Sequence, residues 1–166
     1  MNADFINGME DGMQNLHKQG AFLTVKSGDK VNTMTISWGN IGFMWQMPIF
    51  TIMVRKSRYT YELIEKGESF TVSIPYGPGM RSALGVCGTK SGRNTDKVKE
   101  AGIAFVPSKE VEAPIVDGCS MYYECRIVGK LPMNEKMLDT EMQKKFYSDN
   151  DYHVFYYGQI VTSYEK

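Results

Sequence analysis

The chain has 166 residues, about the size of one folded domain, and 42% of them are hydrophobic against 23% charged, which excludes bulk disorder. Nineteen Lys and Arg balance nineteen Asp and Glu, so the net charge is zero. The overall basic excess that marks a nucleic-acid-binding protein is missing, and we expect no nucleic-acid partner.

The cysteines and the N-terminus indicate where the protein works. Cys87, Cys119 and Cys125 are an odd number without the spacing of a disulfide framework, so we expect reduced thiols in a cytoplasmic protein. The N-terminus lacks a basic start followed by an apolar stretch and predicts no signal peptide. The most apolar region, residues 41–54, is interrupted by a glutamine and a proline and is too short to span a bilayer. We therefore expect no membrane segment.

The predicted elements are mainly strands. The first twenty residues are rich in Gly, Asn and acids, and we expect an N-terminal arm or short helix there. Residues 21–38 predict a hairpin with a turn at 27–30, after which Gly39 and Gly42 interrupt the pattern. The rest of the chain predicts a strand at 48–54, a helix at 55–67 capped by Ser57 or Arg58, a strand at 69–75, a short helix at 78–86, a loop at 88–94, a helix capped by Asn94 or Thr95, strands at 103–108 and 120–131, a helical segment at 135–146 and a last strand at 152–164.

Strands joined by turns, rather than a regular alternation of strands and helices, indicate a mostly β protein. We expect one domain over residues 1–166, a β-barrel that carries peripheral helices. The pattern alone leaves an OB-like or an SH3-like barrel open.

The first candidate site is the basic, hydroxyl-rich turn at which the strand 48–54 ends and a helix begins. A helix start offers free N–H groups and a partial positive charge, which suit a phosphate. The turn adds cationic and hydroxyl side chains from Arg55, Lys56, Ser57, Arg58, Tyr59 and Thr60. The alternative is a solvated loop with ordinary helix caps.

A second stretch, residues 88–97, has the same character. It combines glycines and hydroxyls with Lys90, Arg93 and Lys97, and it leads into another helix. Neither stretch matches a P-loop or a dinucleotide-binding glycine motif. Two such turns in one small domain favour a phosphate-bearing ligand over two solvated loops.

The third candidate is the strand at 31–39, which carries polar side chains where a core strand would be apolar. Asn32, Thr33, Thr35 and Ser37 are polar. Exposed backbone and hydroxyl groups beside Trp38 could bind the edge of a flat heterocycle, with Met34 packed on its face. An edge strand with threonines on its solvent face is the alternative.

Six short motifs follow one another along the chain. They are Asn32-x-Met34-Thr35-x-x-Trp38-Gly39, a proline before a strand, Arg55-x-x-x-Tyr59-Thr60, Ser91-Gly92-Arg93-x-x-Asp96-Lys97, Glu124-Cys125-Arg126 and Gly158-Gln159-Ile160. In this order they resemble the flavin reductase-like, FMN-binding split-barrel family, and the flavoredoxins most of all. The similarity runs in register from about Gly20 to Val161.

This resemblance implies a Greek-key split β-barrel that forms a homodimer, with non-covalent FMN bound near the subunit interface. The strand that begins the motif series would lie against the isoalloxazine ring, both basic turns would hold the phosphate, and an aromatic residue before the last motif would approach the flavin. The cofactor-binding residues that it implies are Asn32, Thr33, Met34, Thr35, Trp38, Arg55, Ser57, Arg58, Tyr59, Thr60, Lys90, Ser91, Lys97 and Tyr157.

The activity implied is that of an oxidoreductase that takes electrons from NADH, NADPH or a reduced protein partner and passes them to a flavin, a protein or a small acceptor. Because the flavin carries the redox chemistry, no catalytic acid, base or nucleophile is required of the protein. A flavin-storing protein without access for a nicotinamide is the main alternative. Related barrels that bind pyridoxal phosphate or haem are a further one.

Other reactive residues receive structural interpretations. His17 and His153 lack a neighbouring cluster of ligands, so we expect no metal site. Cys87 lies beside the second turn, and an inert buried thiol is favoured over a redox-active one. The acidic residues between Glu110 and Glu124 are expected on a solvated face.

Overall fold

The structure is a computed structural model, and it describes residues 3–166, so the first two residues of the expected N-terminal arm lie outside the described part. The strands are β1 (Ala21–Ser27), β2 (Lys30–Ile36), β3 (Gly39–Met44), β4 (Met47–Arg55), β5 (Ser69–Ile74), β6 (Phe105–Val106), β7 (Ile115–Val116), β8 (Met121–Pro132) and β9 (His153–Glu165). The helices are η1 (Ala3–Ile6), α1 (Met9–Gln19), α2 (Tyr59–Ile64), α3 (Arg81–Thr89), α4 (Lys97–Ala101), η2 (Glu135–Met137) and α5 (Thr140–Phe146).

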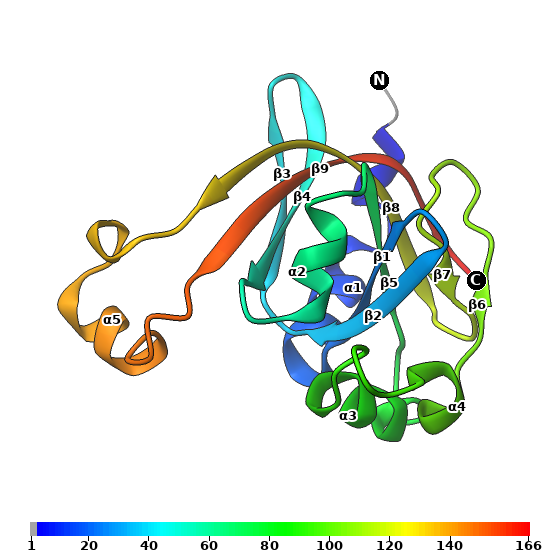
Figure 1. The fold of residues 1–166 in the computed structure, drawn as a ribbon. Coiled ribbons are helices and arrows are strands. Elements are labelled where there is room, and N and C mark those ends of the chain that lie inside the picture. The colour runs from blue at the N-terminus through cyan, green and yellow to red at the C-terminus, as the bar shows by residue number, and fades with distance from the viewer. Residues whose placement is uncertain (1–2) are drawn as a thin grey trace.

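One antiparallel sheet of seven strands, in the order β2-β1-β5-β8-β9-β4-β3, dominates the protein (Figure 1). Its edge strands β2 and β3 are consecutive in the chain, and the path from Ile36 to Gly39 reaches at most about 10 Å. A flat sheet of this width would hold its edges about 29 Å apart. The sheet therefore curls until its edges approach, without hydrogen bonds that close it. The predicted mostly β barrel with peripheral helices is confirmed, and its open seam lies between β2 and β3.

Both faces of the central strands are covered, which explains why β1 and β5 are almost entirely buried. Along β1, Leu23 and Val25 join the main core inside the curl, whereas Phe22 points to the other face. There it packs in a second cluster with Leu84 of α3 and Tyr122 of β8. This second layer fixes α3 behind the β1–β2 hairpin. No helix within residues 3–166 is long and apolar enough to cross a bilayer.

Several predicted elements differ from the structure because long-range contacts decide them. Gly39 and Gly42 do not interrupt a strand but lie within β3, which pairs with β4 in a hairpin. The strand expected at 103–108 shrinks to β6, since only its partner β7 pairs with it. The helix expected at 55–67 is the shorter α2, and the one expected at 78–86 is α3, shifted toward the C-terminus. The cap of α4 is Asp96, whose carboxylate accepts the Lys99 N–H.

Glu124 departs from the expectation of a solvated acidic face, whereas Glu110, Glu112 and Asp117 of the same stretch are exposed as expected. The Glu124 side chain is buried with no exposed area, and its carboxylate accepts the N–H groups of Lys109 and Glu110 and the hydroxyl of Tyr164. A buried carboxylate is tolerated because these donors replace water. Glu124 therefore fastens the loop that precedes β7 onto the sheet.

A long excursion, residues 133–152, connects β8 to β9 and is called the arm below. It carries η2 and α5 and projects from the body of the protein beyond the ends of β8 and β9 (Figure 1). Its root is fixed by a backbone hydrogen bond of 3.0 Å from Met133 N–H to the carbonyl of His153. The arm therefore starts and ends at the same place in the sheet.

Candidate functional site

A cavity of about 340 Å³ lies where three segments meet: the edge strand β2, the turn before α2 and the loop after α3. It is lined by Asn32, Met34, Thr35, Ser57, Arg58, Tyr59, Thr60, Cys87, Gly88, Thr89, Lys90, Ser91, Gly92, Arg93 and Lys97. The structure thus brings together all three segments that the sequence singled out, although they are far apart in the chain. The motif that begins at Asn32, the Tyr59-Thr60 end of the motif that begins at Arg55, and the Ser91–Lys97 motif share one hollow.

The charge of this cavity has one sign. The cavity is lined by Arg58, Lys90, Arg93 and Lys97, and by no acidic side chain of residues 3–166. Lys90 pairs with Glu100 at 3.6 Å, and Arg93 pairs with Glu62. Arg58 and Lys97 take part in none of the ion pairs found within residues 3–166. The cavity therefore offers two cations without a carboxylate partner to an incoming anion.

Lys97 is the most unusual of these cations because it is only 7% exposed. Its ammonium donates to the carbonyls of Thr33 at 2.8 Å and Cys87 at 3.2 Å, which ties α4 to β2 and to the end of α3. Burial lowers the pKa of Lys97, and the positive charge of Arg58 adds to that shift. An ammonium has three protons, so one remains free to face the cavity.

Hydroxyl and amide groups complete the floor between β2 and α2. The Asn32 amide donates to Thr60 Oγ1 at 2.9 Å, and Thr60 is 1% exposed. The Thr60 hydroxyl hydrogen is therefore free to point elsewhere. Thr35 donates to the carbonyl of Leu84 at 2.7 Å, which anchors β2 to α3. Since α2 has only six residues, the positive character of the site comes mainly from side chains and not from a helix dipole.

A smaller hollow of about 140 Å³ continues the first along β2. It shares Met34, Thr35 and Arg58 with the first cavity and is further lined by Ile36, Ser37, Trp38, Met53, Arg55 and His153. As an edge strand, β2 pairs with β1 on one side only. The two hollows together form an elongated site with a basic end and an end beside Trp38.

Two of the predicted cofactor residues lie away from these hollows. The Thr33 side chain is buried and donates to the carbonyl of Leu23, so only its backbone carbonyl, bound by Lys97, belongs to the site. Tyr157 pairs with Thr51 in the sheet and packs edge-to-face on Trp45 with ring centroids 5.6 Å apart. It lines neither hollow of this chain.

Arg55 does not line the basic cavity but holds the arm. Its guanidinium donates to the carbonyl of Asp151 at 2.7 Å and to that of Phe146 at 2.9 Å, and it lies 3.7 Å from the carboxylate of Asp149. It also lies 5.1 Å from the centroid of the Tyr147 ring. The first basic residue of the turn is thus engaged in fastening residues 146–151.

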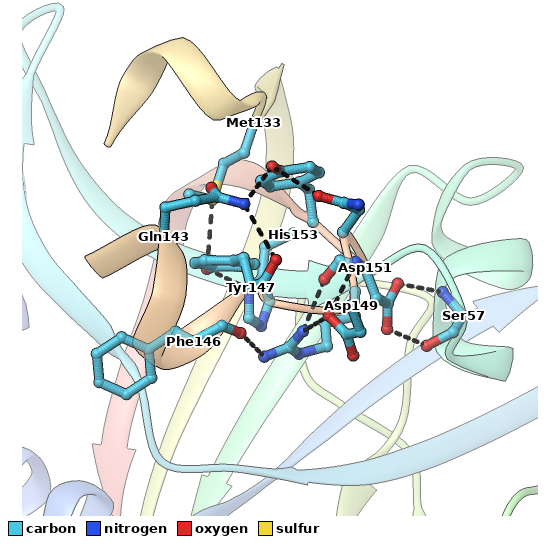
Figure 2. A network of polar contacts seen from close by, with 11 residues as sticks. Ser57, Met133, Gln143, Phe146, Tyr147, Asp149, Asp151 and His153 are labelled. Carbon is cyan, nitrogen blue, oxygen red and sulfur yellow. Dashed lines mark hydrogen bonds and ion pairs between the residues drawn. The ribbon is translucent and has the colours of Figure 1, made fainter. Parts of the chain in front are cut away.

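Ser57 faces both the cavity and the arm. It lines the basic cavity, while its hydroxyl donates to Asp151 Oδ2 at 2.5 Å and its N–H to Oδ1 at 3.3 Å (Figure 2). Trp38, which lines the smaller hollow, packs edge-to-face on Phe146 at 5.4 Å. The arm therefore contacts both ends of the elongated site.

His153 lies at the junction of the arm and the smaller hollow. Burial lowers its pKa to about 4, and the charge of Arg55 adds to that shift, so the imidazole is neutral at pH 7. Its Nδ1 lies 2.7 Å from the Tyr147 hydroxyl, which a neutral ring can accept. The sequence offered no signal for this pairing, because a histidine in a strand looks the same whether or not a ligand lies near it.

The arm residues that reach the site had no distinguishing sequence pattern. Phe146, Tyr147 and Asp151 come from a polar helical segment and its exit loop, and only the fold returns them to β2 and to the turn before α2. Cys87 lines the basic cavity as a buried thiol whose pKa is raised by burial, against the influence of Lys97. Within residues 3–166 no three His, Cys, Asp or Glu side chains gather as metal ligands would.

Comparison with known families gives this geometry a context. Residues 13–165 match the family model described as the flavin reductase like domain. The chain belongs to this family. The resemblance carried by the six sequence motifs is thereby confirmed.

Solved structures share the fold of this flavin reductase-like chain. Flavoredoxin from Methanosarcina acetivorans is 26% identical, with a TM-score of 0.70 over 89% of this chain and 68% of its own. An FMN-binding protein from Thermus thermophilus, with bound 1-cyclohex-2-enone, is 21% identical, with a TM-score of 0.69 over 88% of this chain and 69% of its own. An NADH:FAD oxidoreductase from Streptomyces globisporus is 19% identical, with a TM-score of 0.67 over 89% of this chain and 76% of its own. The last two show the fold alone.

Proposed function

We propose that this flavin reductase-like protein binds FMN and acts as an oxidoreductase of the flavin reductase or flavoredoxin type. The observation that carries the proposal is the pair of cations, Arg58 and buried Lys97, that line one cavity without a carboxylate in ion-pair range within residues 3–166. A buried cation without a counter-ion is costly. A phosphate monoester would supply that counter-ion.

The residues fit FMN along the elongated site. The phosphate would contact Arg58, Thr60, Lys90, Ser91 and the free proton of Lys97, all of which line the basic cavity. The flat ring would lie along the outer edge of β2, from Met34 and Thr35 toward Trp38. Bound FMN would supply the electron-accepting chemistry, while the chain binds, orients and shields it.

The donor and the acceptor are proposed at the level of chemical class. NADH or NADPH, or a reduced protein, would supply electrons, and a flavin, a protein or a small molecule would accept them. A flavoredoxin and an NADH:FAD oxidoreductase both share this fold, which supports such a role. A flavin-storing protein with the same site but no room for a nicotinamide is the second candidate.

The three cysteines are free and buried, which suits a reducing, cytoplasmic compartment.

An anaerobic absorbance titration tests the function. We expect FMN to bind with a micromolar or lower dissociation constant, and NADH or NADPH to bleach the bound flavin. Thr60→Val, which keeps the shape of a buried side chain but removes its hydroxyl, should weaken FMN binding by about tenfold. A protein that does not bind FMN contradicts the proposal. If FMN binds but only dithionite or a reduced protein bleaches it, the protein is a flavoredoxin or a storage protein and not a nicotinamide-dependent reductase.

We further propose that two copies of the chain form the working unit. The tip of the β3–β4 hairpin exposes Phe43 (52%), Met44 (38%) and Trp45 (61%), which is a costly apolar surface for a monomer. Tyr157 packs on Trp45 beside this tip, so a second copy seated there would place Tyr157 at the interface. Light scattering of the purified protein should give the mass of two chains, and Trp45→Ser should shift it toward one. A mass of one chain at protein concentrations of tens of micromolar contradicts the proposed dimer.

A further inference from the structure

We propose that the Arg93–Glu62 bridge closes the phosphate end of the site and makes Arg93 a specificity-determining residue, which selects a flavin mononucleotide over a flavin dinucleotide. The inference rests on the proposed function, because it concerns the same site. It goes further in naming the group that ends the site and the ligand class that this group excludes.

Arg93 spans the gap between the loop after α3 and helix α2. Its Nε donates to Glu62 Oε1 at 3.0 Å, and its Nη2 contacts the same oxygen. Its Nη1 donates to the carbonyl of Ser57 at 3.2 Å, and the guanidinium lies 5.7 Å from the centroid of the Tyr59 ring. A single planar guanidinium thus joins the loop to both the preceding turn and the first turn of α2.

The loop beside Arg93 packs closely against the strand and the helix that face it. A Cβ added at Gly92 would overlap Asn32 Oδ1 and would lie 3.0 Å from Tyr59 Cδ1. Asn32 is itself held by its hydrogen bond to Thr60. The backbone at Gly92 therefore rests directly against β2 and α2, next to the residue that reaches Glu62.

The proposed closure would decide whether a bound flavin nucleotide can extend beyond its first phosphate. A terminal phosphate needs only to reach Arg58, Ser91 and Lys97, which line the cavity inside the bridge. A dinucleotide continues through a second phosphate to an adenosine, and in the proposed closure this continuation would meet the Arg93–Glu62 contact.

The size of the effect follows from the exposure of the bridge. The Arg93 and Glu62 side chains are 43% and 49% exposed, and exposed ion pairs are weak. The additional contacts to Ser57 and Tyr59 strengthen this one. We therefore expect selectivity of about tenfold rather than absolute exclusion.

The test is a fluorescence titration of FMN and of FAD with the wild-type chain, residues 1–166, and three variants. Arg93→Ala removes the bridge, and Glu62→Ala releases Arg93 while leaving its charge near the phosphate. Arg126→Ala is the matched control, because Arg126 is an exposed arginine that donates to Gln159 at 2.7 Å on the sheet and does not line the cavity. The readout is the ratio of the FAD and FMN dissociation constants, which a uniform loss of affinity would leave unchanged.

We expect the wild type and Arg126→Ala to prefer FMN by about tenfold, and both bridge variants to lose most of that preference. A wild type that binds both flavins equally, or a ratio that Arg93→Ala and Glu62→Ala leave unchanged, overturns the inference while FMN binding still supports the proposed function. A wild type that binds neither flavin overturns both. Loss of FMN affinity in Arg93→Ala alone, with an unchanged ratio in Glu62→Ala, shows that Arg93 contributes charge and not closure.

Discussion

Replacing Lys97 by methionine should weaken FMN binding by about tenfold to a hundredfold, which corresponds to one charge-assisted hydrogen bond of about 1.5–3 kcal/mol. The buried ammonium has one proton left after its bonds to Thr33 and Cys87, and no acidic side chain within residues 3–166 lines the cavity to compete for it. Methionine keeps the length and the packing of the side chain but not its charge.

The same change should alter the free energy of unfolding of the FMN-free protein by less than about 1 kcal/mol, because removal of a desolvated charge offsets the loss of two hydrogen bonds. Lys99→Met is the matched control, since Lys99 lies in the same helix with an exposed side chain. Flavin titration and urea unfolding measure the two quantities separately. Unfolding that becomes several kcal/mol easier with unchanged FMN affinity would make Lys97 a structural clamp only.

The basic cavity could be predicted from the sequence because its signals are local. Each contributing segment carries hydroxyls and cations at the boundary of a strand or helix, and the order of the motifs assigns them to one family. Thr60 and Lys97 were therefore found without knowledge of the fold, and the structure places both around one hollow. What the sequence could not predict is the geometry between them, such as the amide of Asn32 bound to Thr60.

Residues whose partners lie far along the chain could not be interpreted in this way. Arg55 binds carbonyls 91 and 96 residues away, and a basic residue beside a helix start looks the same whether it faces a phosphate or a carbonyl. Glu124 lies in an acidic stretch, and only the folded loop supplies the N–H donors that permit its burial. The β3 strand was hidden by two glycines, since its pairing with β4 depends on the hairpin and not on its own composition.

The attachment of the arm is linked to the site, because Arg55, Ser57 and Trp38 each contact the arm and also line the site. Arg55 lies in the strand that ends at the phosphate turn, while Asp151 occupies the N–H and the hydroxyl of Ser57. A phosphate that drew the Ser57 hydroxyl toward the cavity would remove one of these bonds. Arg55 then carries a larger share of the attachment, so its substitution should disturb the arm most extensively.

Arg55→Ala should therefore release the arm while the sheet stays folded. The guanidinium, whose side chain is only 19% exposed, makes two hydrogen bonds to carbonyls, and their loss should cost about 3 kcal/mol of local stability. That energy corresponds to amide hydrogen exchange about a hundredfold faster in residues 143–152. Exchange in β1 and β5, which are buried by both core clusters, should change little.

Two further variants separate charge from geometry. Arg55→Lys keeps the positive charge near Asp149 but cannot reproduce the two-pronged contact with Asp151 and Phe146, so it should restore only part of the protection. Lys56→Ala, an exposed neighbour in the same turn, should behave as the wild type. If Arg55→Ala leaves exchange in the arm unchanged while FMN affinity collapses, Arg55 serves the phosphate directly, and the arm is held by Ser57 and Trp38 instead.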